Sequence, residues 1–268
     1  MKIHHLNCGT MRPMGGALLN QSPALIVCHC LLINTGRELI LVDAGVGIAD
    51  MKDPRRLGPM RFLLNMKADV QDTAAEQVKA LGYKTEDVRH ILITHLDLDH
   101  AGGLPDFPRA EVHVLRPEYE AATHPTTFRE KERYRRCHFA HSPRWVVHEM
   151  PGNDDWFGLP CVRDTDRLPE EIVLVPLPGH TRGHCGVAIR TPERWLLHAG
   201  DAYYHERRMA EAGGCTPGFI AFEWFAHIDH GRAMKQMRAL WQVVNRHKGE
   251  VETCCTHDPS EFSRLRNR

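Results

Sequence analysis

Short apolar runs rich in valine, isoleucine and leucine recur along the sequence, and they constrain the fold more than any other feature. Each run is bounded by glycine, proline, asparagine or aspartate, which is typical of β-strands. They predict strands over residues 25–33, 38–45, 90–94, 111–116, 172–177, 185–190, 195–200 and 250–256. Several runs are apolar on both faces, which indicates sheets that are covered on both sides.

Two segments have the periodicity of helices. Residues 73–83 form the first, with Gly82 as its C-terminal stop, and residues 230–248 form the second. In the second segment Met234, Met237, Trp241 and Val244 recur at helical spacing, which predicts a face that packs into the core. This pattern over 268 residues indicates a single domain that spans residues 1–268.

A polar and basic segment over residues 117–145 interrupts the pattern, and it is weakly helical at its centre. We interpret it as an inserted, capping segment over one end of the sheets. A solvated charged face is the alternative explanation for its arginines.

The composition is that of an ordinary globular protein, with 42% hydrophobic and 25% charged residues. A formal net charge of zero gives no argument for nucleic acid or an anionic membrane as a partner. The nine cysteines lack CxxC spacing, and we find neither a signal-peptide core nor an apolar run of membrane-spanning length. We therefore expect a cytoplasmic protein with reduced thiols and a small-molecule partner, and leave both a monomer and a homodimer open.

Four titratable side chains directly follow the strand predicted over 90–94. These are His95, Asp97, Asp99 and His100, and Gly102 and Gly103 follow them. Imidazoles and carboxylates are the ligands that Zn²⁺, Fe²⁺ and Mn²⁺ prefer in proteins. A single His-x-Asp pair would be weak evidence, but this whole loop after a strand predicts part of a metal site.

Three more predicted strands end in residues of the same kind. His180 lies in a Pro-Gly-His-Thr turn, Asp201 follows the strand over 195–200, and His257 follows the last strand. Sites are often built where strands end in loops, so we expect these side chains to converge with the first loop.

Together, the segments 95–100, 179–181, 200–201 and His257 resemble the metallo-β-lactamase-fold hydrolases. The signature of that family is a His-x-His-x-Asp-His loop, a Gly-His-Thr/Ser turn, a strand-end Gly-Asp and a final His. Residues 41–45 also match the family's strand-end Asp-x-Gly, so the resemblance covers nearly the whole chain. It implies an α/β fold, a four-layer αββα sandwich of two mixed sheets flanked by helices, with a binuclear metal centre at one edge.

The resemblance also implies roles for individual residues. One metal would bind His95, Asp97 and His180, and the other would bind Asp99, His100 and His257. Asp201 would bridge the two divalent ions, with zinc as the first choice, and a metal-bridging hydroxide would be the nucleophile. Asp99 would also help to orient that nucleophile.

Tyr204 lies three residues after Asp201, which is the spacing of the lactonase-like branch of the family. There it implies a catalytic tyrosine that reaches the substrate carbonyl or the leaving oxygen. A core or surface tyrosine is the alternative.

Asp97 departs from the family pattern, which has histidine at this position. A third ligand carboxylate would lower the positive charge of the centre and acidify bound water less. Oxygen ligands also favour harder ions, so manganese or iron becomes plausible beside zinc. The alternative is that Asp97 is not a ligand and that the first metal site is partly lost.

Other residues are expected to support the site. Asp43 would fix a loop near the metals, and His184 would orient His180 from behind or hydrogen-bond the backbone. The aromatic stretch over residues 214–230 offers Phe222 and Trp224 as pocket walls, with core packing as the alternative. Further histidines that could line the pocket, although a plain structural role suits each of them better, are His198, His205, His227 and His230.

These residues predict a metal-dependent hydrolase of an ester-like bond, with a lactone as the first substrate class. Thioester hydrolysis of the glyoxalase II type is the alternative on the same fold. A non-catalytic protein that binds metal or senses a ligand is the alternative from another class, and Asp97 is the feature that favours it.

Overall fold

The computed structural model describes residues 1–13, 25–210 and 215–268. The larger sheet has six strands in the order β1-β2-β3-β4-β5-β6. The first three are antiparallel, whereas β3 to β6 run parallel. Their bounds are Lys2–Met11, Ile26–Asn34, Leu39–Val42, Val88–Leu92, Glu111–Leu115 and Arg144–His148.

The smaller sheet has four strands in the order β12-β11-β10-β9. The strands β9, β10 and β11 are antiparallel, and β12 joins β11 in parallel. Each sheet thus combines an antiparallel part with a parallel part, so the two halves of the chain are built alike. The bounds are Ile172–Pro176, Cys185–Arg190, Trp195–His198 and Val251–Cys254, and a separate hairpin pairs β7 (Asp155–Trp156) with β8 (Leu159–Pro160).

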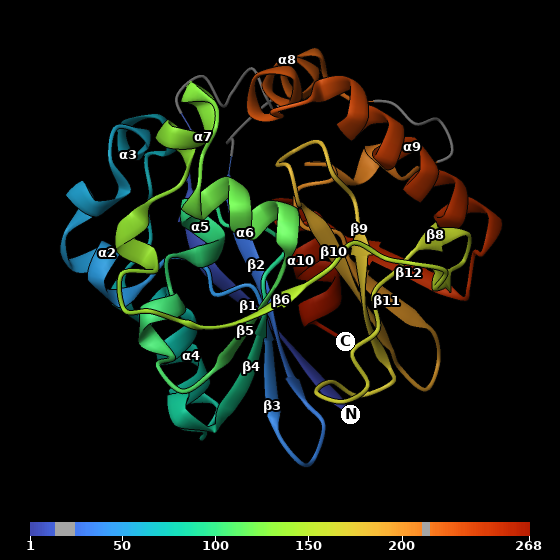
Figure 1. Cartoon of the computed structure of the whole chain (residues 1–268), viewed down its shortest axis with the longest axis horizontal. Coiled ribbons are helices and arrows are strands. Elements are labelled where there is room, and N and C mark those ends of the chain that lie inside the picture. Colours follow the sequence, from blue (N-terminus) through green and yellow to red (C-terminus); the bar gives the residue numbers. More distant parts are fainter. Residues whose placement is uncertain (14–24, 211–214) are drawn as a thin grey trace.

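The two sheets face each other with helices outside them (Figure 1). Apolar side chains from both sheets form the central core, among them Leu31, Leu92 and Val187. Helix α4 (Ala74–Ala80) packs on the outer face of the larger sheet, and α9 (His230–Arg246) packs on the outer face of the smaller one. The predicted αββα sandwich is therefore confirmed.

The other helices are short. They are α2 (Ile48–Lys52), α3 (Met60–Leu64), α5 (Leu98–Ala101), α6 (Arg116–Thr123), α7 (Phe128–Arg133), α8 (Pro217–Ala226) and α10 (Pro259–Arg266). Single turns of 3-10 helix occur at Pro54–Leu57, Val70–Asp72, Thr85–Asp87, Leu104–Asp106, Arg136–His138 and Glu206–Arg208.

All eight predicted strands and both predicted helices are present within a few residues of their expected ends. The sequence pattern missed β1, which is polar over much of its length because it lies at the edge of the larger sheet. It also missed β6, which begins at the end of the predicted insertion. Within the predicted insertion the structure places α6 and α7. The buried residues of α6 are Glu118, Ala121 and Ala122, and that of α7 is Glu130, so neither helix has a strongly apolar face.

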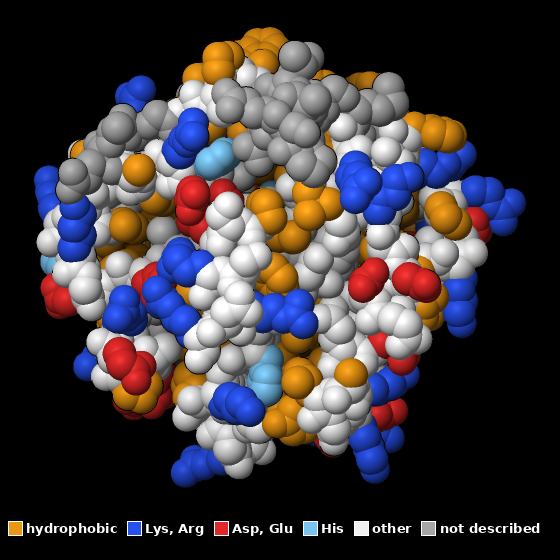
Figure 2. Space-filling model, turned by 180° about the vertical axis from the view of Figure 1, so that it is seen from behind, with side chains coloured by type: hydrophobic (Ala, Val, Ile, Leu, Met, Phe, Trp, Pro, Cys, Tyr) orange, Lys and Arg blue, Asp and Glu red, His pale blue; other side chains and the backbone are white. Residues whose placement is uncertain are grey.

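Among the described residues, no helix is both long enough and apolar enough to cross a bilayer. Basic and acidic side chains are interspersed on the face that Figure 2 shows. This mixture agrees with the formal net charge of zero.

Candidate metal centre

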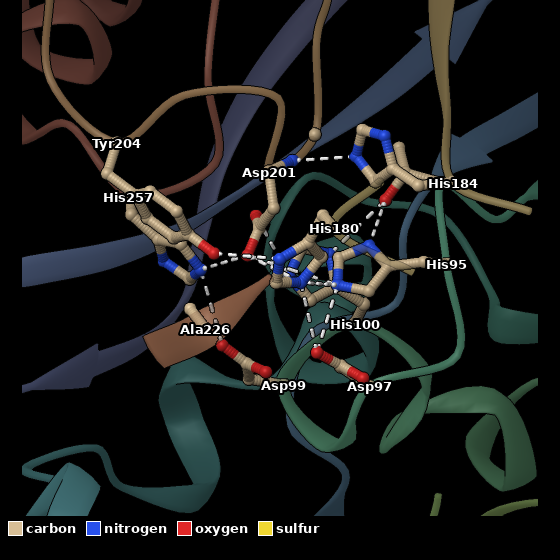
Figure 3. Close-up of polar contacts among 12 residues, drawn as sticks. His95, Asp97, Asp99, His100, His180, His184, Asp201, Tyr204, Ala226 and His257 are labelled. Atoms are coloured by element: carbon tan, nitrogen blue, oxygen red, sulfur yellow. Dashed lines mark hydrogen bonds and ion pairs between the residues drawn. The ribbon is translucent and has the colours of Figure 1, made fainter. Parts of the chain in front are cut away.

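The predicted ligand side chains lie together at one edge of the two sheets, where four strands end (Figure 3). The loop from His95 to His100 follows β4, and His180 follows β9. Asp201 follows β11, and His257 follows β12. Because both sheets end at this edge, residues more than 150 positions apart in the chain come into contact.

His95, Asp97 and His180 form what we call the first cluster. The His95 Nε2 and His180 Nε2 atoms are 3.1 Å apart, and they lie 3.3 and 3.2 Å from Asp97 Oδ2. Ligand atoms that share one ion at about 2.0–2.2 Å lie about 3.2–3.6 Å apart in a tetrahedral arrangement. The spacing of these three atoms is close to that range.

We call Asp99, His100 and His257, the residues that the resemblance assigns to the second ion, the second cluster. The ligand-type atoms of Asp99 and His257 lie together with that of Cys28, whereas that of His100 groups with those of His95 and Asp201. The His257 Nε2 atom lies 3.5 Å from Asp99 Oδ2. Asp201 faces both clusters, because its Oδ2 atom lies 3.2 Å from His257 Nε2 and 3.4 Å from His180 Nε2, while its Oδ1 atom lies 3.4 Å from His100 Nε2.

The hydrogen bonds behind the second cluster fix which imidazole nitrogens face inward. His257 Nδ1 donates to the Val27 carbonyl at 2.7 Å, and His100 Nδ1 donates to Asp43 Oδ2 at 2.8 Å. In the neutral rings, Nε2 is then an acceptor that points at a carboxylate oxygen. His100 Nε2 and Asp201 Oδ1 are buried atoms with no hydrogen-bond partner. Buried acceptors that face one another fit a cation between them, so the donor set suits a divalent metal.

The charge of the second cluster leads to the same conclusion. Burial acts to lower the pKa of His100, but the carboxylates of Asp201, Asp43 and Asp99 raise it well above its usual value. The pKa of His257 is likewise raised, since the attraction of Asp201 outweighs burial. This concentration of buried carboxylates demands positive charge, which either imidazolium or metal cations can supply.

Asp43 makes three hydrogen bonds at this edge. Its carboxylate accepts from the Thr94 backbone N–H at 2.7 Å, the Thr94 hydroxyl at 2.8 Å and the His100 ring. The residue is fully buried and adopts a left-handed φ of 57°. It therefore ties the end of β3 to the loop after β4 without facing the ligand atoms.

His184 hydrogen-bonds to backbone groups through both of its ring nitrogens. Its Nδ1 donates to the Leu177 carbonyl at 2.9 Å, and its Nε2 accepts from the Asp201 backbone N–H at 2.9 Å. Burial lowers its pKa to about 3, so the ring is neutral and can accept at Nε2. His184 thus orients the Asp201 loop, and its hydrogen bond to the backbone is the alternative that the sequence had left open.

Glu118 was not singled out in the sequence, yet it joins two ligand loops. It is fully buried on α6, and its two oxygens accept from the Leu96 N–H at 2.9 Å and the Gly183 N–H at 3.0 Å. The glutamate lies within a polar segment, so only the tertiary structure shows that it points inward.

Arg133 is the other residue that sequence reasoning missed. It ends α7, and its guanidinium enters the first cluster and makes an ion pair with Asp97. Asp97 therefore does lie with His95 and His180, but a protein cation is also among its partners. Burial acts to raise the pKa of Asp97, whereas Arg133 and His95 lower it well below its usual value.

Tyr204 is buried beside the first cluster. Its hydroxyl lies 3.0 Å from His180 Nδ1, and its ring stacks on His257 with the centroids 5.6 Å apart. Burial raises the pKa of this phenol well above 10, so it is a neutral donor. Phe222 packs edge-on against the Tyr204 ring, while Trp224 is 69% exposed.

The remaining predicted histidines differ in their distance from the ligands. His227 Nδ1 lies 3.2 Å from His180 Nδ1, and His230 stacks on His227. His198 instead donates to the His29 carbonyl in the core, and His205 lies near Asp258. Only His227 therefore contacts a predicted ligand directly. Gly214, the first residue of the aromatic stretch, is outside the described residues.

A cysteine also approaches the second cluster. Cys28 Sγ lies 3.9 Å from Asp99 Oδ2, and burial raises the pKa of the thiol well above its usual value. All nine cysteines are free, and seven of them are buried. The prediction of buried thiols thus holds for most of the set.

Comparisons with known proteins agree with this geometry. Residues 24–240 match the family model of the metallo-beta-lactamase superfamily. The chain is 40% identical to a Mycobacterium tuberculosis (strain ATCC 25618 / H37Rv) protein named "Probable metallo-hydrolase Rv2300c", over 100% of this chain and 83% of that protein. It is 27% identical to "N-acyl homoserine lactonase AttM" of Rhizobium radiobacter, over 99% of this chain and 96% of that protein.

A solved structure has the same fold. It is described as an N-acyl homoserine lactone hydrolase with the product N-hexanoyl-L-homoserine bound at the catalytic metal center. The TM-score is 0.73 at 23% identity, and the alignment covers 98% of this chain and 95% of that one. From its motifs, its fold and the match over residues 24–240, the chain belongs to the metallo-β-lactamase superfamily.

Proposed function

We propose that this metallo-hydrolase opens lactones, using two divalent cations, with zinc as the first choice. The observation that carries the proposal is the convergence of the two clusters on Asp201, with a neutral tyrosine hydroxyl beside them. Relatives named as N-acyl homoserine lactonases support this substrate class. When bound, the cations would acidify a water molecule and polarise the substrate carbonyl.

Individual side chains would bind the cations, orient the attacking water and donate a hydrogen bond. Asp201 and the imidazoles would hold the cations, and Asp99 would also orient the attacking water. The Tyr204 hydroxyl would donate to the oxygen that gains charge when the ester bond breaks. Because this phenol is buried and neutral, it can keep its proton at the pH of the reaction.

A groove next to the centre offers room for the rest of the substrate. A cavity of about 520 Å³ is lined by the apolar side chains of Trp224, Phe225 and Ile228 and by the polar ones of Arg129, His227, Asp229 and His230. His227 also contacts His180, so the groove adjoins the first cluster. We propose that this groove takes an apolar substituent of the lactone, because exposed aromatic side chains gain most by covering apolar groups.

The test measures hydrolysis of a panel of substrates by the zinc-loaded protein. The acid that each reaction releases is detected with a pH indicator in weak buffer. The panel contains an unsubstituted γ-lactone, N-acyl homoserine lactones with short and long acyl chains, an aryl ester and a glutathione thioester. We expect the long-chain lactones to give the highest kcat/KM. Asp201→Asn should abolish turnover, while Asp166→Asn, a change at an exposed carboxylate, should not alter it.

Other outcomes identify the alternatives. A thioester that is cleaved faster than every lactone would identify a hydrolase of the glyoxalase II type. Tight metal binding without turnover of any panel member would instead indicate a metal-binding or ligand-sensing protein. Repeating the panel with manganese and iron tests whether Asp97 favours harder ions.

A further inference from the structure

Arg133 makes polar contacts with two members of the first cluster and with a backbone carbonyl beside it. Its Nε and Nη2 atoms each lie 2.5 Å from an oxygen of Asp97, which is the fork-shaped geometry of a bidentate ion pair. Nη2 also lies 2.5 Å from His180 Nε2, and Nη1 donates to the Ala226 carbonyl at 2.8 Å. The side chain is only 15% exposed, so these contacts hold the guanidinium inside the site.

The contact with His180 is the important one. A neutral imidazole nitrogen that carries no proton has a single lone pair. His180 Nε2 can give that lone pair to the Arg133 N–H or to a metal ion, but not to both. The Oδ1 atom of Asp97 faces Nε of Arg133, whereas its Oδ2 atom also faces His95 and His180. An ion at the first cluster can therefore share Asp97 with Arg133, but it must displace the guanidinium from His180.

Charge adds a second effect in the same direction. A guanidinium is always protonated, and here it lies within a few ångströms of the place that a divalent cation would occupy. The two like charges repel, and the low exposure of the Arg133 and Asp97 side chains strengthens this repulsion. The charges of Asp97 and Arg133 cancel. The pair therefore has the same net charge, zero, as the neutral histidine that the family has at position 97.

We propose that Arg133 is a built-in competitor for the first metal position, so that the second cluster fills first and the first cluster binds its ion weakly. This inference rests on the metal binding in the proposed function and adds an order of filling to it. Arg133 acts through the ligands and is therefore a positioning residue. The weak position would respond to the free metal concentration, whereas the strong one would stay occupied.

The experiment is a titration of metal-free protein with Zn²⁺ against a competing chelator, with Co²⁺ absorption as a second readout of ligand geometry. For the wild type we expect one tight event and a second event at least tenfold weaker. Arg133→Met should tighten the second event at least tenfold and leave the first unchanged.

A matched control lies on the same helix. Arg129 is four residues earlier and donates to the Phe225 carbonyl at 2.6 Å, much as Arg133 donates to Ala226, but it has no contact with a predicted ligand. Arg129→Met should therefore leave both binding events unchanged.

Changes at Asp97 give an independent test. Asp97→His alone should weaken the second event further, because it leaves the Arg133 charge unpaired beside an ion. The double variant Asp97→His/Arg133→Met should bind two ions tightly, and it tests the inference even if Arg133→Met alone does not fold. Equal affinities in wild type and Arg133→Met, or two tight ions in Asp97→His alone, would overturn the inference. If no variant and no wild-type sample binds any ion, the proposed function itself fails.

Discussion

At the scale of the residue, Tyr203 and Tyr204 are neighbours with different surroundings. Both are buried, but the Tyr203 hydroxyl hydrogen-bonds Glu261 at 3.0 Å within the smaller-sheet half, whereas the Tyr204 hydroxyl meets His180. The pair therefore gives a matched comparison between a structural tyrosine and a candidate catalytic one.

We expect Tyr204→Phe to lower kcat for lactones about 100-fold, which is the usual loss when one donor to a developing oxyanion is removed. Tyr203→Phe should instead cost about 1 kcal/mol of unfolding free energy through one lost hydrogen bond, with kcat unchanged. Steady-state kinetics and denaturant titration measure the two effects. Similar kcat values for the two variants would argue against a catalytic Tyr204.

Single residues also show how far the sequence could predict the site. The seven candidate ligands could be identified because each follows an apolar strand, so their convergence depends only on where the strands end. Arg133 and Glu118 could not be identified, since both lie in a polar segment in which inward and outward side chains look the same. Their partners are fixed by tertiary structure, not by a local pattern.

At the scale of the element, helix α6 supports the ligand turn after β9. A Cβ atom on Gly183 would lie 2.2 Å from the Glu118 backbone nitrogen, so only glycine allows the turn and the helix to approach this closely. This close approach also lets the Gly183 N–H donate a hydrogen bond to the Glu118 carboxylate.

Gly183→Ala should therefore cost about 1–3 kcal/mol of unfolding free energy, in the range of overpacked cores, and should weaken metal binding by moving His180. Gly152→Ala is the matched control, because a Cβ there would meet nothing within 4 Å. Chemical denaturation of both variants measures the difference. If the two glycines tolerate alanine equally well, this packing does not position the turn.

A row of three imidazoles, which is separate from the candidate metal ligands, crosses the parallel strands β4, β5 and β6. His113 on β5 contacts His90 on β4 and His148 on β6, each at 2.9 Å. Burial, together with repulsion from His148 and His90, lowers the pKa of His113 to about 2. The ring thus stays neutral in the folded protein at pH values where the unfolded chain would take up a proton.

Since the unfolded state binds that proton below about pH 6.5, His113 should cost up to about 1.4 kcal/mol of stability per pH unit as the pH falls from there toward 2. Above pH 6.5 it contributes no pH dependence. His113→Gln should therefore show a shallower loss of unfolding free energy between pH 7 and 5 than the wild type. His124→Gln, a change at an exposed histidine, should keep the wild-type slope; the same slope for His113→Gln would refute the prediction.

The elements themselves were predictable to different extents. Strands such as β3 and β9 are buried along their whole length, so their composition is uniformly apolar and easy to detect. The edge strand β1 is half-buried at many of its positions and carries two histidines, so its sequence does not stand out. Short helices such as α2 and α5 depend on neighbouring packing more than on their own periodicity.

At the scale of the whole molecule, the candidate ligands come from loops that follow strands of both sheets. His95, Asp97, Asp99 and His100 follow a strand of the larger sheet, while His180, Asp201 and His257 follow strands of the smaller one. Ions held between them should stabilise the folded state, because the unfolded chain does not assemble this set.

Removing metal should therefore lower the melting temperature. One bound ion whose concentration is about a thousand times its Kd adds about 4 kcal/mol, which corresponds to about 10 °C for a chain of this size. Calorimetry with and without a chelator measures the shift, and added zinc should reverse it. The chelator should lower the melting temperature of Asp201→Asn much less than that of the wild type. A wild-type melting temperature that the chelator leaves unchanged would show that metal binding and folding are not coupled.

Because the candidate ligands are divided between the two halves of the chain, the protein could be produced as two fragments. The loop between β6 and β7 is exposed around Gly152, so a cut there would leave four candidate ligands on one fragment and three on the other. Neither fragment alone would have the full set of candidate ligands. A cation would then promote reversible association of the two separately produced polypeptides. Reassociation of such fragments would report occupancy of the centre without any substrate.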